Sequence, residues 1–271
     1  MKEMKLKEIQ SISLEILKDV HHFCVTHNIK YTLQGGTLLG AIRHNGFIPW
    51  DDDIDIAMPR PDYDFFCNNY QSKKGYKCIS RQNANCYIAF ARVCEMEKTI
   101  VKNPTNPWID IETGVWIDIF PLDGSEDDFD EAQKTNILIS KQWRKGLLLR
   151  YCYAKYSSRE KLKEKIKLFI KRIRNIGRIH VFDKHIEMCK RIPFGKTEHY
   201  SNLSLCGYGM REYHRTSVID KCELHRFEDD EFLIMAGYHE ALKEKYGDYM
   251  KYPPIEEQHS NHQSNHYYWK F

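Results

Sequence analysis

Four aspartates crowd into five positions directly behind an apolar segment, in the run FIPWDDDIDIAM at residues 47–58: Asp51, Asp52, Asp53 and Asp55. Like charges packed this closely repel one another and weaken folding unless positive charge lies among them. Residues two apart on a strand point to the same face, so Asp53 and Asp55 would project together while Ile54 and Ile56 enter the core. The run therefore predicts a buried strand that carries two neighbouring carboxylates.

Paired carboxylates on one strand are hard oxygen ligands suited to Mg²⁺ or Mn²⁺. One or two divalent cations would supply the positive charge that this run lacks. Asp118, in the segment WIDIF at 116–120, has the same apolar flanks and could complete the site from a neighbouring strand. Its alternative role is that of a capping residue near a strand end. Asp51 and Asp52 are open to two roles, as ligands of the ion or as hydrogen-bonding partners in the turn.

A glycine pair, Gly35–Gly36, precedes this strand by fewer than 20 residues. With Thr37 as the cap of a helix over residues 38–43, the pair would expose backbone N–H groups that can hold a phosphate. Alone, a glycine pair indicates no more than a turn. Beside metal-binding carboxylates it predicts phosphoryl or nucleotidyl transfer, in which positioning and charge neutralisation provide most of the catalysis.

Five further residues are candidates for contacts with a donor, and each has a plainer structural alternative. Arg43 and Arg92 could hold phosphates, or could lie on the surface. Trp50 could stack on a base or cover a cationic head group, or could belong to the core. His259 and His262, in an aromatic and histidine-rich tail, could approach the site or pack elsewhere.

The bulk composition predicts a globular, cytoplasmic protein. Of 271 residues, 42% are hydrophobic, which suffices for a packed interior. Nine cysteines without a CxxC pair argue against a disulfide framework and a zinc ribbon. The start is charged and amphipathic, unlike a secretory signal, and no apolar run approaches the roughly 18 to 20 residues that span a bilayer.

Periodicity and turn signals predict both helices and strands along the chain. Helices are expected at 4–27, from Pro59 onward, over much of 127–189, and at 232–246. Strands are expected at 29–33, 54–58, 87–93 and 115–120, with Pro121 ending the last.

A basic segment interrupts an otherwise acidic chain. Residues 141–191 contain 17 Lys or Arg and four acids, against 24 basic and 34 acidic residues elsewhere. Five apolar residues there have helical spacing: Ile166, Phe169, Ile170, Ile173 and Ile176. They predict either a core-facing helix with a solvated basic side or a peripheral contact with an anionic membrane. Nucleic-acid binding is disfavoured, because the segment lacks an RNA-binding motif.

Three blocks together resemble the LicD family, bacterial phosphocholine transferases related to the fukutin-type enzymes: GGTLLGAIRHNGFIPWDDDIDIAMPRPDYD at 35–64, WIDIFPLDG at 116–124 and YGDYMKYPPIEEQHSNH at 246–262. Their order and spacing extend the resemblance nearly end to end. It implies an α+β fold, a nucleotidyltransferase-like small mixed sheet flanked by helices. The catalytic core would span 1–125, an added basic helical region 126–195, and a C-terminal part completing the active site 196–271.

The resemblance also implies a reaction. A phosphorylated head group, phosphocholine first, would move from a CDP-linked donor to a sugar hydroxyl of a cell-surface glycan or lipid-linked acceptor, such as lipopolysaccharide, teichoic acid or capsule, releasing CMP. Asp53, Asp55 and Asp118 would be the metal ligands, and Asp118 could also act as the base. Phosphoethanolamine and phospho-alditol transfer stay open, as does an NTP-dependent nucleotidyltransferase that releases pyrophosphate. The tail reads HSNHQ where the family would have adjacent histidines, which leaves the roles of His259 and His262 open between donor binding and packing.

Overall fold

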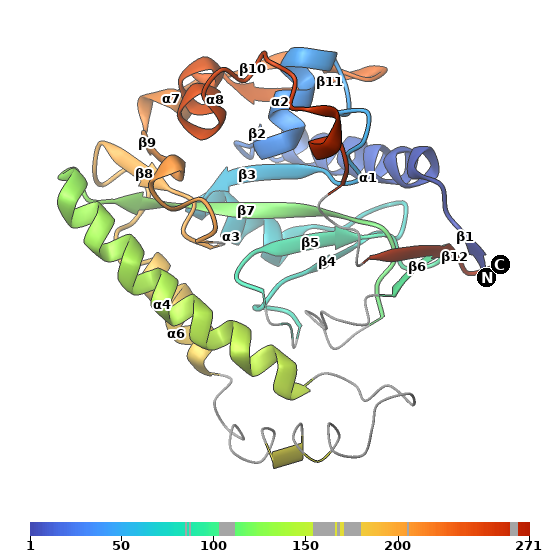
Figure 1. The fold of residues 1–271 in the computed structure, drawn as a ribbon, viewed down its shortest axis with the longest axis horizontal. Helices are drawn as coiled ribbons and strands as arrows, with labels where there is room; N and C mark the ends of the chain where they lie inside the picture. The colour runs from blue at the N-terminus through green and yellow to red at the C-terminus, as the bar shows by residue number, and fades with distance from the viewer. Residues whose placement is uncertain are drawn as a thin grey trace.

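A mixed sheet with helices packed around it forms the body of the molecule (Figure 1). The computed structural model describes residues 1–84, 86, 88–102, 112–153, 166, 169–170, 180–204, 206–260 and 265–271.

The central sheet has seven strands, in the order β2-β3-β7-β5-β4, with β8 paired to β7 and β9 to β8. Within the described residues β3 and β7 are its one parallel pair, so the sheet is mixed, as expected for an α+β fold. The strands are β2 (Thr32–Leu33), β3 (Asp55–Pro59), β4 (Lys77–Ile79), β5 (Ala91–Cys94), β7 (Trp116–Ser125), β8 (His199–Ser201) and β9 (Tyr213–Arg215).

Helices cover this sheet and extend beyond it. Phe23 of α1 packs edge-on against Phe66 of α3, with ring centroids 5.6 Å apart, so α1 and α3 lie together against the sheet. No helix in the described part of the chain is long and apolar enough to cross a bilayer. The helices are α1 (Leu6–Thr26), α2 (Gly35–His44), α3 (Arg60–Asn69), α4 (Phe129–Tyr153), α6 (His180–Cys189), α7 (Ser217–Asp220) and α8 (Tyr238–Tyr246).

Two smaller sheets complete the fold. β12 (His266–Trp269) lies between β1 (Lys2–Glu3) and β6 (Thr99–Lys102), which brings both chain ends to one side of the molecule (Figure 1). β10 (Cys222–Phe227) and β11 (Asp230–Met235) form an antiparallel hairpin near α2. Short 3₁₀ helices η1 (Gly209–Glu212) and η2 (Ile255–Glu257) lie between these elements.

The predicted helix at 232–246 is wrong in its first part. Residues up to Met235 form β11, whose Phe232 and Ile234 are fully buried, and only Tyr238–Tyr246 is helical. Pairing with β10 overrides the local pattern, and Gly237 separates strand from helix as the residue that caps α8. The predicted end of the helix at Gly247 is confirmed.

Pro121 does not end its strand, as the sequence predicted, because β7 continues to Ser125. The pairing of β7 with β5 ends at Ile119, and that with β8 begins at Asp123. Pro121 lies in the gap between these two partners, where its missing N–H costs no ladder hydrogen bond. The strands predicted at 29–33 and 87–93 shorten to β2 and β5.

Three of the apolar residues in the basic segment are exposed to solvent. Ile166, Phe169 and Ile170 have 50%, 58% and 43% of their surface accessible. A core-facing helix is therefore wrong for these three. Ile173 and Ile176 lie outside the described residues.

Candidate active site

Two carboxylates lie side by side on the parallel strands at the centre of the sheet. The register places Asp55 of β3 opposite Asp118 of β7, and Asp118 opposite Arg92 of β5. The isoleucines that flank both acids are fully buried: Ile54, Ile56, Ile117 and Ile119. The predicted alternation is thus confirmed, and it directs Asp55 and Asp118 to the face opposite the core.

Arg92 fixes the orientation of Asp118. Its Nε donates a hydrogen bond to Asp118 Oδ1 at 2.7 Å, and its guanidinium lies 4.2 Å from the centre of the Trp116 ring. Both partners of the ion pair are largely buried, which strengthens the interaction relative to a surface pair. Asp118 would therefore compete with a donor phosphate for Arg92, the contact that the sequence suggested.

The glycine pair opens α2 directly. The helix begins at Gly35 with Gln34 as its N-cap, and Gly35 has a φ of +58°. Thr37 is not the cap that the sequence predicted, because the left-handed glycine allows the helix to start three residues earlier. Instead, Thr37 Oγ1 accepts a hydrogen bond from the Asp55 backbone N–H at 2.8 Å. The start of α2 is thereby fastened to the strand that carries the carboxylate.

Both glycines leave space beside carboxylates that a side chain would fill. A Cβ at Gly35 would lie 3.3 Å from Asp55 Oδ2 and 3.6 Å from Lys245 Nζ, and one at Gly36 would lie 2.9 Å from Asp51 Oδ2. A pocket of about 40 Å³ opens here, lined by Gln34, Gly35, Gly36, Asp55, Phe120, Asn202, Cys206, Gly207, Tyr208, Glu212, Lys245 and Tyr246. Backbone N–H groups at a helix start and a lysine ammonium make this space suited to a phosphate.

The rest of the acidic run forms a compact cluster next to the strand. Carboxylate oxygens of Asp51, Asp52 and Asp53 lie within 4.8 Å of one another. Asp53 precedes β3, which begins at Asp55, so the two are not neighbours on one strand as predicted. Clustered carboxylate oxygens fit a hard divalent cation, and Asp51 Oδ2 lies where it borders the space that a side chain at Gly36 would occupy.

The C-terminal tail contacts this cluster through Ser260. Ser260 Oγ donates a hydrogen bond to Asp52 Oδ1 at 2.5 Å, and the exposed His259 precedes Ser260. His262 lies outside the described residues.

Two further predicted contacts lie away from the pocket. Arg43 is eight residues along α2 from Gly35, or about 12 Å at the helical rise. Its Nη1 donates to the backbone oxygens of Tyr249 and Lys251, so Arg43 holds the C-terminal block in place. Trp50 is half-buried against the main core.

Sequence reasoning missed a buried ion pair in the pocket wall. Lys245 of α8 pairs with Glu212 of η1, and both side chains are under a tenth exposed. The second oxygen of Glu212 accepts a hydrogen bond from Gln34 Nε2 at 2.8 Å. The position of Lys245 directly before the YGDYM block could have indicated that it belongs to the site. No nearby motif in the sequence indicated the same for Glu212.

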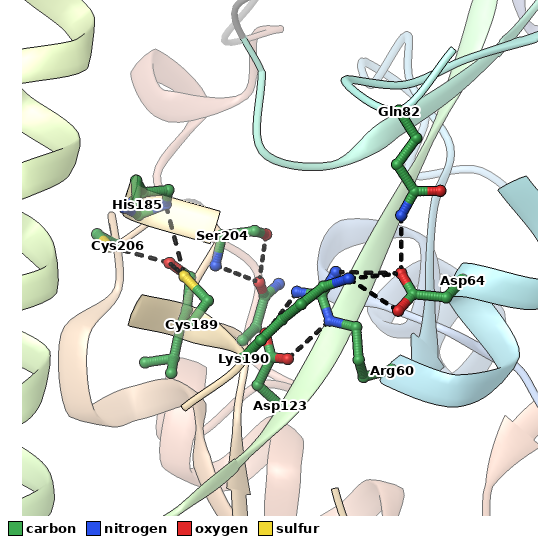
Figure 2. Close-up of polar contacts among 11 residues, drawn as sticks. Arg60, Asp64, Gln82, Asp123, His185, Cys189, Lys190, Ser204 and Cys206 are labelled. Atoms are coloured by element: carbon green, nitrogen blue, oxygen red, sulfur yellow. Dashed lines mark hydrogen bonds and ion pairs between the residues drawn. The ribbon is translucent and has the colours of Figure 1, made fainter. Parts of the chain in front are cut away.

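Asp123, in the block WIDIFPLDG, has a structural role. It is fully buried and accepts two hydrogen bonds from Arg60, at 2.7 and 2.6 Å (Figure 2). Burial alone would lower the pKa of Arg60, but the charge and hydrogen bonds of Asp123 outweigh it and raise that pKa. Asp64 of α3 binds Lys190, just beyond α6, at 2.8 Å in the same network. These pairs connect β7, α3 and the residue that follows α6.

A mixed sheet flanked by helices, with a glycine turn that opens a helix beside it, is consistent with a nucleotidyltransferase-like fold. The family model described as LicD/FKTN/FKRP, nucleotidyltransferase domain, matches residues 28–145. The lipopolysaccharide cholinephosphotransferase LicD of Haemophilus influenzae is 31% identical over 279 residues, with 97% of each chain covered. The chain therefore belongs to the LicD family.

Two shorter matches accompany this one. An uncharacterised protein of Rickettsia typhi is 45% identical over 62 residues, which cover 22% of this chain and 20% of that protein. The ribitol 5-phosphate transferase FKRP of Homo sapiens is 53% identical over 30 residues, which cover 11% of this chain and 6% of FKRP.

Proposed function

We propose that this protein is a metal-dependent phosphotransferase that moves phosphocholine from CDP-choline to a sugar hydroxyl of a cell-surface glycan and releases CMP. The observation that carries the proposal is the row of Asp55 and Asp118 across β3 and β7, next to the pocket at Gly35. The Haemophilus influenzae relative, a lipopolysaccharide cholinephosphotransferase that is similar over 97% of the chain, supports the choice of head group and of a lipopolysaccharide-type acceptor.

Asp53 and Asp55 would hold a Mg²⁺ or Mn²⁺ ion together with Asp51. The carboxylate of Asp51 clusters with that of Asp53, and it lies beside the glycine pair, as that of Asp55 does. Such an ion would neutralise the diphosphate of the donor and stabilise the charge on the leaving CMP. Arg92 engages Asp118 Oδ1, which leaves one oxygen of Asp118 for contact with the acceptor. We therefore assign the ion to the acidic run and a separate task to Asp118.

Asp118 would serve as the base for the acceptor. The acceptor hydroxyl oxygen attacks the β-phosphorus of the donor, and its proton passes to Asp118. The bond between that phosphorus and the oxygen of CMP breaks, so that CMP leaves with the electron pair. Arg92 holds Asp118 Oδ1 and keeps the carboxylate directed at the surface of the sheet where the acceptor binds.

The donor is tested with a panel of CDP-choline, CDP-ethanolamine, CDP-glycerol and CDP-ribitol, each with lipopolysaccharide or a lipid-linked glycan as acceptor. CMP release from CDP-choline that depends on the acceptor is the expected result. CMP from one of the other three would keep the reaction and change the head group. Pyrophosphate from CTP, with no CMP from any of the four, would replace the proposal with nucleotidyl transfer.

We also propose that the protein works at the inner face of a bacterial membrane. Ile166, Phe169 and Ile170 present apolar surface within the basic segment of the sequence. Apolar side chains among lysines and arginines match an anionic lipid surface, where each basic residue contributes on the order of 1 kcal/mol. Lipid-linked acceptors would be within reach of a protein held there.

A further inference from the structure

Lys245 is the basic residue that lines the pocket, among the residues that the structure describes. Arg43 lies at the far end of α2, and Arg92 is engaged by Asp118. We infer that Lys245 contacts the diphosphate of the donor, and that Glu212 is the residue that positions it. The inference rests on the CDP-linked donor proposed above.

Lys245 and Asp55 lie on either side of the space left open by Gly35. A Cβ at this position would be 3.6 Å from the ammonium nitrogen and 3.3 Å from the carboxylate, so the two groups border one small volume. A donor phosphate in that volume would meet the ammonium on one side and the carboxylate with its ion on the other. A divalent cation balances the two negative charges of the diphosphate in a CDP-linked donor, and the ammonium would stabilise the further charge that the oxygen of CMP takes up as the bond breaks.

The surroundings of Lys245 keep its ammonium charged and directed. An ammonium removed from water is costly unless it is paired, and Glu212 supplies the pair. The ring of Tyr208 lies 4.0 Å from Lys245 Nζ and adds a cation–π contact. An ammonium has three donors, so binding to Glu212 leaves donors for a phosphate.

Glu212 links the ammonium to the other half of the phosphate site. One of its oxygens binds Lys245, and the other accepts from the side chain of Gln34, the N-cap of α2. The carboxylate thus sets the position of α8 relative to the first turn of α2. Lys245 and Glu212 both line the pocket, so the same ion pair that joins η1 to α8 also borders the space beside Gly35.

The test is calorimetric binding of CDP-choline and of CMP in the presence of Mg²⁺. Lys245→Met removes one charge-assisted hydrogen bond, so we expect the Kd for CDP-choline to rise about 10- to 100-fold. Lys245→Arg should recover part of that loss. Lys243→Met is the matched control, since Lys243 is exposed on the same turn of α8, and it should bind as the wild type does.

Removal of Lys245 leaves Glu212 buried without its cation, so the single variant could fail to fold. The double variant Lys245→Met/Glu212→Gln removes both charges and should recover the melting temperature but not the affinity. Wild-type affinity in this folded double variant would overturn the inference and leave the proposed function intact. A wild-type protein that binds none of the four CDP-linked donors would overturn both.

Discussion

The Gly35→Ala variant tests whether the space beside Gly35 holds the phosphate, because its effect on activity can be measured separately from its effect on stability. Gly35 has a φ of +58°, and an L-residue in this region costs about 1 to 2 kcal/mol. The added Cβ would lie 3.3 Å from Asp55 Oδ2, a tight contact, and 3.6 Å from Lys245 Nζ, an ordinary one. We therefore expect the free energy of unfolding to fall by little more than the cost of the left-handed backbone conformation, about 1 to 2 kcal/mol.

The matched control is Gly195→Ala. Gly195 has a φ of +79°, and a Cβ there would have no atom within 4 Å. Both variants should lose about 1 to 2 kcal/mol in urea unfolding, since both carry the same backbone penalty and the same change in the unfolded chain. Acceptor-dependent CMP release should separate them, unchanged for Gly195→Ala and reduced about 100-fold for Gly35→Ala, because the methyl group displaces the phosphate.

Two results would refute this reasoning. Wild-type turnover in Gly35→Ala, at a temperature where the variant is folded, would show that the space beside Gly35 does not hold the reacting phosphate. A stability loss several kcal/mol larger than that of Gly195→Ala would show that contacts, rather than the backbone, dominate the cost.

Three further predictions follow from other parts of the structure. Asp55→Asn should lose turnover and also Mn²⁺ binding, as measured by calorimetry, whereas Asp118→Asn should lose turnover alone. EDTA should abolish the activity of the wild type, and activity that needs no metal would contradict the proposed site. Vesicles containing phosphatidylglycerol should co-sediment the wild type at low salt but not a Phe169→Glu variant, and equal binding to neutral vesicles would exclude the proposed contact. Burial lowers the pKa of His185 to about 4, below its usual 6.5, so the unfolded chain binds a proton that the fold does not. The free energy of unfolding should therefore fall by about 2 kcal/mol as the pH drops from 7.5 to 5, and His185→Gln should lack that part of the fall.

The elements with a strong local signal were predictable from the sequence. The alternation of aspartate and isoleucine in DDDIDIAM and WIDIF predicted two strands with their acids on one face, and Ile54, Ile56 and Ile119 are fully buried. The helix predicted at 4–27 is α1, Leu6–Thr26, because its apolar stripe is long and regular. These patterns depend on neighbours two to four residues away, which a sequence displays directly.

Features that depend on distant partners were not predictable. Phe232 and Ile234 suit a helix as well as a strand, and pairing with β10 decides between them. Pro121 is tolerated because two partner strands leave a gap beside it. Thr37 binds the backbone of Asp55, 18 residues away, in place of its own helix start.

Long-range contacts also explain why the residues of the pocket wall could not be predicted from the sequence. Lys245 and Glu212 are 33 residues apart, and Gln34 joins them from 178 residues away, so no local spacing relates the three. The same is true of Ser260 with Asp52 and of Arg43 with Tyr249. The C-terminal part of the chain, from Glu212 to Ser260, is thus bound to the core at three places: the acidic run, the N-cap of α2 and the last turn of α2. Because several of these bonds lie in the site itself, a substitution that loosens the segment should weaken donor binding even where it touches no substrate.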